Sequence, residues 1–294
     1  MSKKIEISKE TLIELTKTKT VSEIAKIYNC SVRTIYNWYE RYELSYKRSE
    51  QSEIKRPKKY IYDDTYFNTI DTEHKAYWLG FIMADGCIIQ KNKKRNSPHL
   101  TLVINLQESD YKHLEKFNND LNGNLPIRHF MSKPVTIHSW NGDVNISEKP
   151  CCKIEVNSKW LCIDLIRHGV SQRKTLNEKI PLMEDSKLIR HFIRGFFDGD
   201  GCFSAIKPSN KKREYPKIMI ASGEIIIDFI INNVYQETGF LMSRDKYHKL
   251  DRCYIQSEEG FLKFVKYIYE DATIFLDRKK ELIDSYMKRY SLTV

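Results

Sequence analysis

Apolar residues at helical spacing predict three short helices between Ser8 and Tyr42. The segment ETLIELTKT predicts the first helix, Thr20 is a suitable N-cap for VSEIAKIYN, and Ser31 is a suitable N-cap for VRTIYNWYERY. Asn29 stands in the tight turn between the last two helices, where asparagine tolerates a left-handed backbone. The side chains expected to face one another across this turn are Ile24, Ala25, Tyr28, Val32, Ile35 and Trp38.

The second and third of these helices resemble the helix-turn-helix of DNA-binding domains, and we place this domain at residues 1–46. In such domains the last helix of the pair lies in the major groove and contacts base edges and phosphates. The residues that this helix would present to DNA are Arg33, Thr34, Asn37 and Arg41. A small helical bundle that packs on the rest of the protein is the alternative.

A polar segment rich in Lys and Arg follows at residues 47–70, and Pro57 within it disfavours a helix. Such a segment is typical of a linker between domains. Lys58 and Lys59 would contact phosphates if the linker follows a DNA duplex. A solvated tether without a DNA contact is the alternative.

The apolar pattern after the linker occurs twice. The segments YWLGFIMADGCI and HFIRGFFDGDGCF each predict a core helix that ends on Asp-Gly, with Thr72 and Ser186 as the expected N-caps. Two strand-like segments, a helix, two more strand-like segments and another helix follow each of them. The repeat predicts an α+β fold of two αββαββα half-domains, residues 71–183 and 184–294, related by a pseudo-twofold axis. The residues that recur are Gly80, Asp85, Gly86 and Cys87, as Gly195, Asp200, Gly201 and Cys202.

Small residues one turn apart give each of these two helices a face that another helix can approach closely. They are Gly80 and Ala84 in the first helix, and Gly195 and Gly199 in the second. Packing of the two faces would bring Asp85 and Asp200 together at two helix C-termini. Carboxylates repel each other and the negative helix ends at such a place, and a divalent cation offsets this repulsion. Mg²⁺ suits one or two carboxylates with phosphate and water.

Residues 78–86 and 193–201 resemble the nine-residue signature of the LAGLIDADG homing endonucleases, and the resemblance covers about three-quarters of the chain. It implies a site-specific endonuclease that cuts both strands of a long, asymmetric DNA target and leaves short 3′ overhangs. The cofactor implied is Mg²⁺, for which Mn²⁺ would substitute. The metal ligands implied are Asp85 and Asp200, one for each DNA strand, and the adjoining Ala84 and Gly199.

Three further residues have catalytic roles by the same resemblance. Lys174 and Lys279 would order the attacking water or stabilise charge on the phosphate, whereas a solvated side chain is the alternative for each. Glu108 would be a polar supporting residue of the first site, with Ser222 as its counterpart in the second. Asp198 keeps the other Asp of the signature and is expected to be structural.

Basic loops follow the signature at equivalent places, QKNKKRNSPH in the first half and KPSNKKREYPK in the second. Strand pairs with such tips can lie in the major groove, with the tips on phosphates and strand side chains on base edges. Exposed hairpin tips that only keep the protein in solution are the alternative. The predicted DNA-binding residues of these loops are Lys91, Lys93, Lys94, Arg95, Lys211, Lys212 and Arg213.

The composition agrees with a nucleic-acid partner. The chain of 294 residues has 49 Lys and Arg against 39 Asp and Glu, for a formal charge of +10. No segment suits a signal peptide or a membrane span, and seven cysteines without a Cys-x-x-Cys pair predict reduced thiols. We therefore expect a cytoplasmic, nucleoid-associated monomer of a bacterial or phage host, which binds double-stranded DNA without a membrane or a protein partner.

The sequence leaves the biological setting and two other functions open. The end of the chain lacks the His-Asn pair of a splicing domain, so we expect a free-standing or intron-encoded protein of a mobile element. One alternative is a non-catalytic DNA-binding transcription regulator of the same fold, which loss of the acids would favour. The other is an RNA maturase that assists intron splicing, which the additional DNA-binding domain disfavours.

Overall fold

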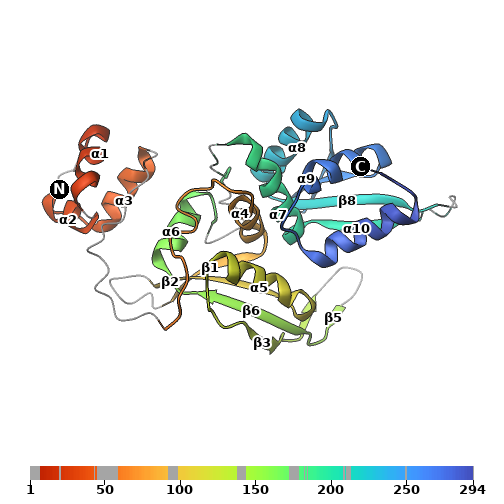
Figure 1. Ribbon diagram of the computed structural model, residues 1–294, viewed down its shortest axis with the longest axis horizontal. Helices are drawn as coiled ribbons and strands as arrows, with labels where there is room; N and C mark the ends of the chain where they lie inside the picture. The colour runs from red at the N-terminus through yellow and green to blue at the C-terminus, as the bar shows by residue number, and fades with distance from the viewer. Residues whose placement is uncertain are drawn as a thin grey trace. The chain divides into compact units, whose positions relative to one another are not determined.

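The structure, a computed structural model, divides the chain into two compact units, Met1–Lys59 and Tyr60–Val294 (Figure 1). The residues that it describes are 7–19, 21–42, 44, 59–91, 99–137, 144–171, 179–181, 183, 185–207, 209, 213–248 and 250–293. Within these ranges no helix is long and apolar enough to cross a membrane. The seven cysteines are free thiols, as predicted.

In the residues described for it, the first unit contains three helices: α1 (Lys9–Thr18), α2 (Val21–Ile27) and α3 (Val32–Arg41). Ser31 caps α3 as predicted, because its Oγ accepts a hydrogen bond from the Thr34 N–H at 3.1 Å. Asn29 has a φ of +47° between α2 and α3, which is the left-handed conformation expected there. Thr20, the predicted cap of α2, lies outside the described residues. The buried side chains of this unit include Leu12, Ile24, Ala25, Ile35 and Trp38.

The second unit contains two half-domains with the same order of elements, which confirms the predicted αββαββα tandem. The first consists of α4 (Glu73–Asp85), β1 (Gly86–Lys91), β2 (His99–Gln107), the 3-10 turn η2 (Glu108–Asp110), α5 (Tyr111–Asp120), β3 (Arg128–Met131), β4 (Val135–Ile137), β5 (Val144–Ile146), β6 (Pro150–Val156) and α6 (Lys159–Arg167). The second consists of the 3-10 turn η3 (Ser186–Leu188), α7 (Ile189–Asp200), β7 (Cys202–Ile206), β8 (Tyr215–Ser222), α8 (Glu224–Thr238), β9 (Ser243–Tyr247), β10 (Leu250–Ile255), α9 (Glu258–Tyr269) and α10 (Asp277–Arg289).

Each half-domain forms one four-stranded antiparallel sheet, in the order β1-β2-β6-β3 in the first and β7-β8-β10-β9 in the second. Two additions break the symmetry between them. The hairpin of β4 and β5 is inserted between β3 and β6, and α10 follows α9. The sequence pattern predicts neither addition.

Helices pack on one face of each sheet. In β8 alternate side chains, among them Ile218 and Ile220, are buried towards α8 and α9, and those between them are partly exposed on the other face. At the centre of the unit α4 and α7 lie side by side between the two sheets (Figure 1). The buried apolar side chains of both half-domains form one continuous cluster around this helix pair. The fold therefore places the two signature helices at the junction of the half-domains.

The linker ends earlier than predicted. Tyr66, Phe67 and Ile70 are buried in the second unit, so the chain is packed from Tyr60 onward and the predicted end of the linker at residue 70 is wrong. The reason is that these three apolar side chains join the core formed by the first half-domain.

The two signature helices begin differently. Thr72 caps α4 as predicted, since its hydroxyl accepts a hydrogen bond from the Lys75 N–H at 3.3 Å. Ser186 does not cap the second helix. The Asp185 side chain instead accepts a hydrogen bond from the Lys187 N–H at 2.9 Å and opens the turn η3, which leads into α7. A neighbouring side chain with the same capping ability therefore takes the predicted role.

Candidate active site

Two glycines let the backbones of α4 and α7 touch. A Cβ atom on Gly80 would lie 2.8 Å from the backbone nitrogen of Phe196 in α7. A Cβ atom on Gly195 would lie 2.9 Å from the backbone nitrogen of Phe81 in α4. Both distances are too short for any side chain, because atoms in protein interiors are packed to contact already. The small residues therefore serve the close helix crossing that the sequence predicts.

The crossing brings the two predicted metal ligands to one place. Asp85 is the last residue of α4 and Asp200 is the last residue of α7. A Cβ atom on Gly199 would lie 3.4 Å from Oδ2 of Asp85 and would overlap the Cβ of Ala84. The Asp85 carboxylate thus lies against the residue that directly precedes Asp200. Asp85 is half-buried and Asp200 is exposed, so solvent reaches this end of the helix pair.

This end of the helix pair has the donors that a hard divalent cation needs. Asp85 and Asp200 end the two helices there, beside carbonyl ends that carry partial negative charge. In the described part of the chain no three or more His, Cys, Asp or Glu side chains gather in a way that could hold a metal ion. Mg²⁺ needs no such cluster, because it binds through one or two carboxylates and takes its other ligands from water and phosphate.

Lys279, at the start of α10, binds the C-terminal end of α7. Its Nζ donates to three carbonyl oxygens, those of Phe197 at 2.6 Å, Asp198 at 2.8 Å and Gly201 at 2.6 Å. These bonds use all three hydrogens of the ammonium group, which are thus directed at the helix end and not at water. Burial lowers the pKa of Lys279, while the charges of Asp198 and Asp85 raise it. Lys279 therefore places a fixed positive charge near Asp85.

Asp198 joins three elements around the same end of α7. Its carboxylate accepts hydrogen bonds from the Tyr77 hydroxyl at 2.8 Å, the Tyr269 hydroxyl at 2.9 Å and the Leu276 N–H at 2.7 Å. Burial raises the pKa of Asp198, whereas the nearby charge of Lys279 and these hydrogen bonds lower it. Asp198 links α4, α9 and the start of α10, in keeping with the structural role expected of it.

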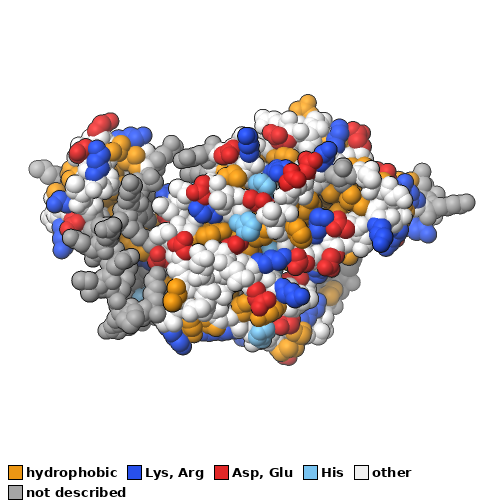
Figure 2. Space-filling view, in the orientation of Figure 1, with side chains coloured by type: hydrophobic (Ala, Val, Ile, Leu, Met, Phe, Trp, Pro, Cys, Tyr) orange, Lys and Arg blue, Asp and Glu red, His pale blue; other side chains and the backbone are white. Residues whose placement is uncertain are grey.

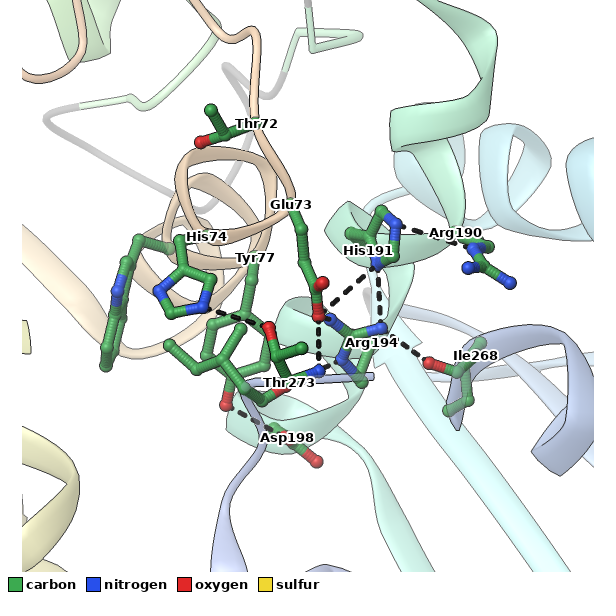
Figure 3. Close-up of polar contacts among 12 residues, drawn as sticks. Thr72, Glu73, His74, Tyr77, Arg190, His191, Arg194, Asp198, Ile268 and Thr273 are labelled. Atoms are coloured by element: carbon green, nitrogen blue, oxygen red, sulfur yellow. Dashed lines mark hydrogen bonds and ion pairs between the residues drawn. The ribbon is translucent and has the colours of Figure 1, made fainter. Parts of the chain in front are cut away.

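A second buried polar group, Arg194, fixes the opposite end of the crossing (Figure 3). Its guanidinium donates to the Glu73 carboxylate at 2.6 Å and to the carbonyl oxygens of Ile274 at 2.8 Å and Ile268 at 2.7 Å. Glu73 also accepts a hydrogen bond from the Thr273 N–H at 2.8 Å. Because Glu73 is in the first turn of α4, the network ties α4 to α7 and to the chain after α9. The helix pair that carries the acids is therefore held at both ends.

Glu108, the predicted supporting residue of the first site, is bonded to a side chain of β3. Its carboxylate pairs with Nδ1 of His129 at 2.7 Å. The strand register pairs Gly86 with Ile104 in the first half and Cys202 with Met219 in the second, which makes Glu224 the counterpart of Glu108. Ser222 is not that counterpart, because the sequence alignment is shifted there by two residues. Glu108 and Glu224 both open the helical segment that follows the second strand.

The predicted DNA-binding residues of the first unit lie on one helix. Arg33, Asn37 and Arg41 of α3 are exposed, and the Arg41 guanidinium is 5.1 Å from the centre of the Trp38 ring. Thr34 is partly buried and its hydroxyl bonds with that of Ser31 at 2.9 Å.

The predicted residues of the basic loops and the linker are only partly described. Lys59 is exposed, and Lys91 ends β1. Arg213 is engaged within the protein: it donates to Glu258 at 2.6 Å, and its guanidinium lies 4.5 Å from the centre of the Tyr290 ring. The predicted residues outside the described part of the chain are Lys58, Lys93, Lys94, Arg95, Lys174, Lys211 and Lys212.

The sequence analysis expected strand side chains on base edges but named only residues of the loops. On these faces Lys153 of β6 is opposite Asn105 of β2, and Arg252 of β10 is opposite Ala221 of β8. Alternation of buried and exposed positions along β6 and β8 is the signal that could have indicated them.

Comparison with known proteins gives matches to both units. A family model described as a helix-turn-helix domain matches residues 5–45. The fold resembles that of the LAGLIDADG meganuclease I-AabMI bound to uncleaved DNA, with 15% identity over 73% of this chain and 89% of that chain, and a TM-score of 0.47. The meganuclease I-SmaMI bound to uncleavable DNA matches with 12% identity over 72% of this chain and 87% of that chain, and a TM-score of 0.48.

A further match is the full-length DUF199/WhiA protein from Thermatoga maritima. Its identity is 16% over 79% of this chain and 66% of that chain, with a TM-score of 0.40. The search of curated proteins returned no match. The second unit thus consists of two αββαββα half-domains with paired signature helices, and the segment that matches the helix-turn-helix model precedes it.

Proposed function

We propose that this protein is a site-specific, divalent-metal-dependent DNA endonuclease of the LAGLIDADG type. The observation that carries the proposal is the contact of the Asp85 carboxylate with Gly199, the residue before Asp200, at the solvent-accessible end of a glycine-packed helix pair. Two carboxylates at the solvent-accessible ends of paired helices, where the helix carbonyls already carry partial negative charge, fit a cation site better than a structural one.

In the proposed reaction Asp85 and Asp200 would each hold one divalent cation, Mg²⁺ or Mn²⁺, with Ala84 and Gly199 beside them. A bound cation there would activate water and stabilise charge on the phosphate that is cut. Asp85 and Asp200 come from different half-domains, so each would face one strand of the duplex, and the resemblance to the LAGLIDADG endonucleases implies a double-strand cut with short 3′ overhangs. Lys279 keeps the end of α7 in place and adds positive charge.

The duplex is proposed to lie on the open faces of the two sheets, because helices pack on their other faces. The face of the second unit shown in Figure 2 carries acidic and basic side chains side by side, so its charge is mixed. Since the open faces of the two half-domains carry different side chains, the target is asymmetric. Both acids belong to one chain, which supports a monomeric enzyme.

Helix α3 would extend the contact with DNA beyond this site through Arg33, Asn37 and Arg41. The helix-turn-helix match of residues 5–45 also supports a second candidate function, that of a DNA-binding transcription regulator which does not cut. The presence of both acids at one solvent-accessible place favours the endonuclease.

The test is incubation of the protein with a randomised duplex library and Mg²⁺, followed by sequencing of the ends produced. We expect discrete ends with the wild-type chain, and none in EDTA. Asp85→Asn and Asp200→Asn should each abolish double-strand cleavage and leave binding of the selected duplex in place, because the amide removes the charge and keeps the size. Normal cutting by Asp200→Asn would overturn the metal assignment, and retention of uncut duplex by the wild-type chain would favour the regulator.

A further inference from the structure

Two arginines on neighbouring strands of the second sheet lie on opposite faces. Arg244 of β9 is on the helix side, where it pairs with Asp251 at 2.6 Å and with Asp228 and Glu224 of α8. Asp251 is buried, whereas Arg244, Asp228 and Glu224 are 31%, 48% and 62% exposed, so this cluster lies at the surface where α8 meets the sheet. The ion pairs of Arg244 therefore link β9 to α8.

Arg252 of β10 is on the open face, opposite a carboxylate of β9. Its Nε donates to Oδ1 of Asp245 and its Nη2 donates to Oδ2, both at 2.7 Å. The side chains are 25% and 41% exposed. The hydrogen bond and charge of Arg252 lower the pKa of Asp245. The pair is bidentate, and it holds the guanidinium plane in one orientation.

The strand register places this pair in line with the candidate active site. Arg252 is opposite Ala221, and Cys202 is opposite Met219. Asp200 ends α7 two residues before Cys202, so it lies at the same end of the sheet as Ala221. Arg252 is opposite Ala221 on β10, the second strand from β7, at the end of the sheet that adjoins Asp200. Arg252 therefore lies near the proposed cut and not at the far end of the sheet.

A carboxylate is unfavourable on a surface that contacts a polyanion, unless it has another role there. Asp245 holds Arg252 through Nε and Nη2, which turns the outer edge of the guanidinium, formed by Nη1 and Nη2, away from the carboxylate. That edge matches the O6 and N7 acceptors of guanine in the major groove. Arginine is suited to such a role because its fork is planar and rigid.

We propose that Arg252, oriented by Asp245, reads a guanine in the part of the DNA target that the second half-domain covers. The inference rests on the proposed function only in that a duplex lies on the open sheet faces. At the equivalent end of the sheet of the first half-domain, next to the start of β1 that follows Asp85, the residue opposite Asn105 is Lys153. Lysine there acts as a point charge and lacks the fork, so the same guanine contact is not repeated in that half.

The test selects DNA by binding to the full-length chain, from a randomised duplex library in EDTA, so that cutting plays no part. The wild-type chain should select sites with a guanine at one position close to the centre. Arg252→Gln should reduce the preference for that guanine by about tenfold or more, and leave the other positions unchanged. Asp245→Asn should also weaken it while raising affinity for random-sequence duplex, because it removes one negative charge. A role of the pair in stability alone would produce neither change.

The matched control is Arg244→Gln, which removes the same charge from the neighbouring strand. It should lower the midpoint of thermal unfolding, since three carboxylates lose their partner, and leave the selected sequence as it was. Selection of the same guanine by Arg252→Gln would overturn the inference while the proposed function stands. Failure of the wild-type chain to select any duplex would overturn both, and the cleavage test of the Asp200→Asn variant reports on the proposed function separately.

Discussion

At the scale of single residues, two adjacent lysines of α10 differ in what they stabilise. Lys279 is buried and donates to three backbone carbonyls at the end of α7. Lys280 pairs with Asp284 one turn further along the same helix, at 2.5 Å, and Asp284 is half exposed. The first is an internal cap of another helix, whereas the second is an ordinary pair on a helix surface.

This difference gives a prediction for the two lysines. Lys279→Met leaves three carbonyls and the buried Asp198 without their cation, so we expect a loss of about 3–5 kcal/mol in the free energy of unfolding. Lys280→Met should lose only about 0.5 kcal/mol, because exposed pairs of this spacing are weak. Urea unfolding followed by circular dichroism measures both. Equal losses in the two variants would contradict the role of Lys279 as the cap of α7.

Several residue-scale predictions depended on neighbours along the chain and were confirmed. Ser31 and Thr72 cap their helices because the accepting side chain and the donating N–H are three residues apart. The prediction that Ser186 caps the second signature helix was wrong, because the Asp185 side chain accepts the capping hydrogen bond instead. Arg213 was expected on DNA, yet it stacks on Tyr290, which is far away in the sequence and cannot be paired with it from local pattern.

At the scale of elements, the crossing of α4 and α7 decides where the acids lie. Phe81 and Phe196 present backbone nitrogens to the places where a Cβ would be on Gly195 and Gly80. Small-residue spacing made this crossing predictable. The sequence pattern could not show that Glu224, and not Ser222, is the counterpart of Glu108. A shift of two residues preserves the alternation of buried and exposed positions, so only the strand register distinguishes the two.

Gly195→Ala tests the crossing. The added methyl group would overlap the backbone of α4, so the helices must separate, and we expect a loss of about 3 kcal/mol or more in stability with a large fall in cutting rate. Gly239→Ala is the control: its Cβ would meet nothing within 4 Å, and the left-handed φ of +67° costs about 1–2 kcal/mol. Thermal unfolding and cleavage of the selected target report the two effects. Normal cutting by Gly195→Ala would show that the acids do not depend on this contact.

At the scale of the whole molecule, the helix-turn-helix segment and the two half-domains form separate compact units. The acids, the buried network of Figure 3 and the open sheet faces all belong to the second unit. The formal charge of +10 is a property of the entire chain and favours binding of a polyanion by both units.

Deletion of residues 1–46 is therefore expected to separate binding from chemistry. The shortened chain should bind the selected target more weakly and protect a shorter footprint, because the contacts of α3 are lost. Cutting at the same phosphates should persist at high protein concentration. Footprinting and end sequencing measure the two properties, and an unchanged footprint would show that the first unit has no role on DNA.

The sequence by itself determined the doubled αββαββα order, the helix-turn-helix segment and the acids at the ends of two small-residue helices, because periodicity, caps and repeats are local or self-similar. Only the tertiary structure decided the end of the linker at Tyr60, the capping of α7 by Lys279, and the pairing of Arg252 with Asp245 on an open face. Each of these depends on which surfaces meet and in what register, and that is settled when the whole core packs.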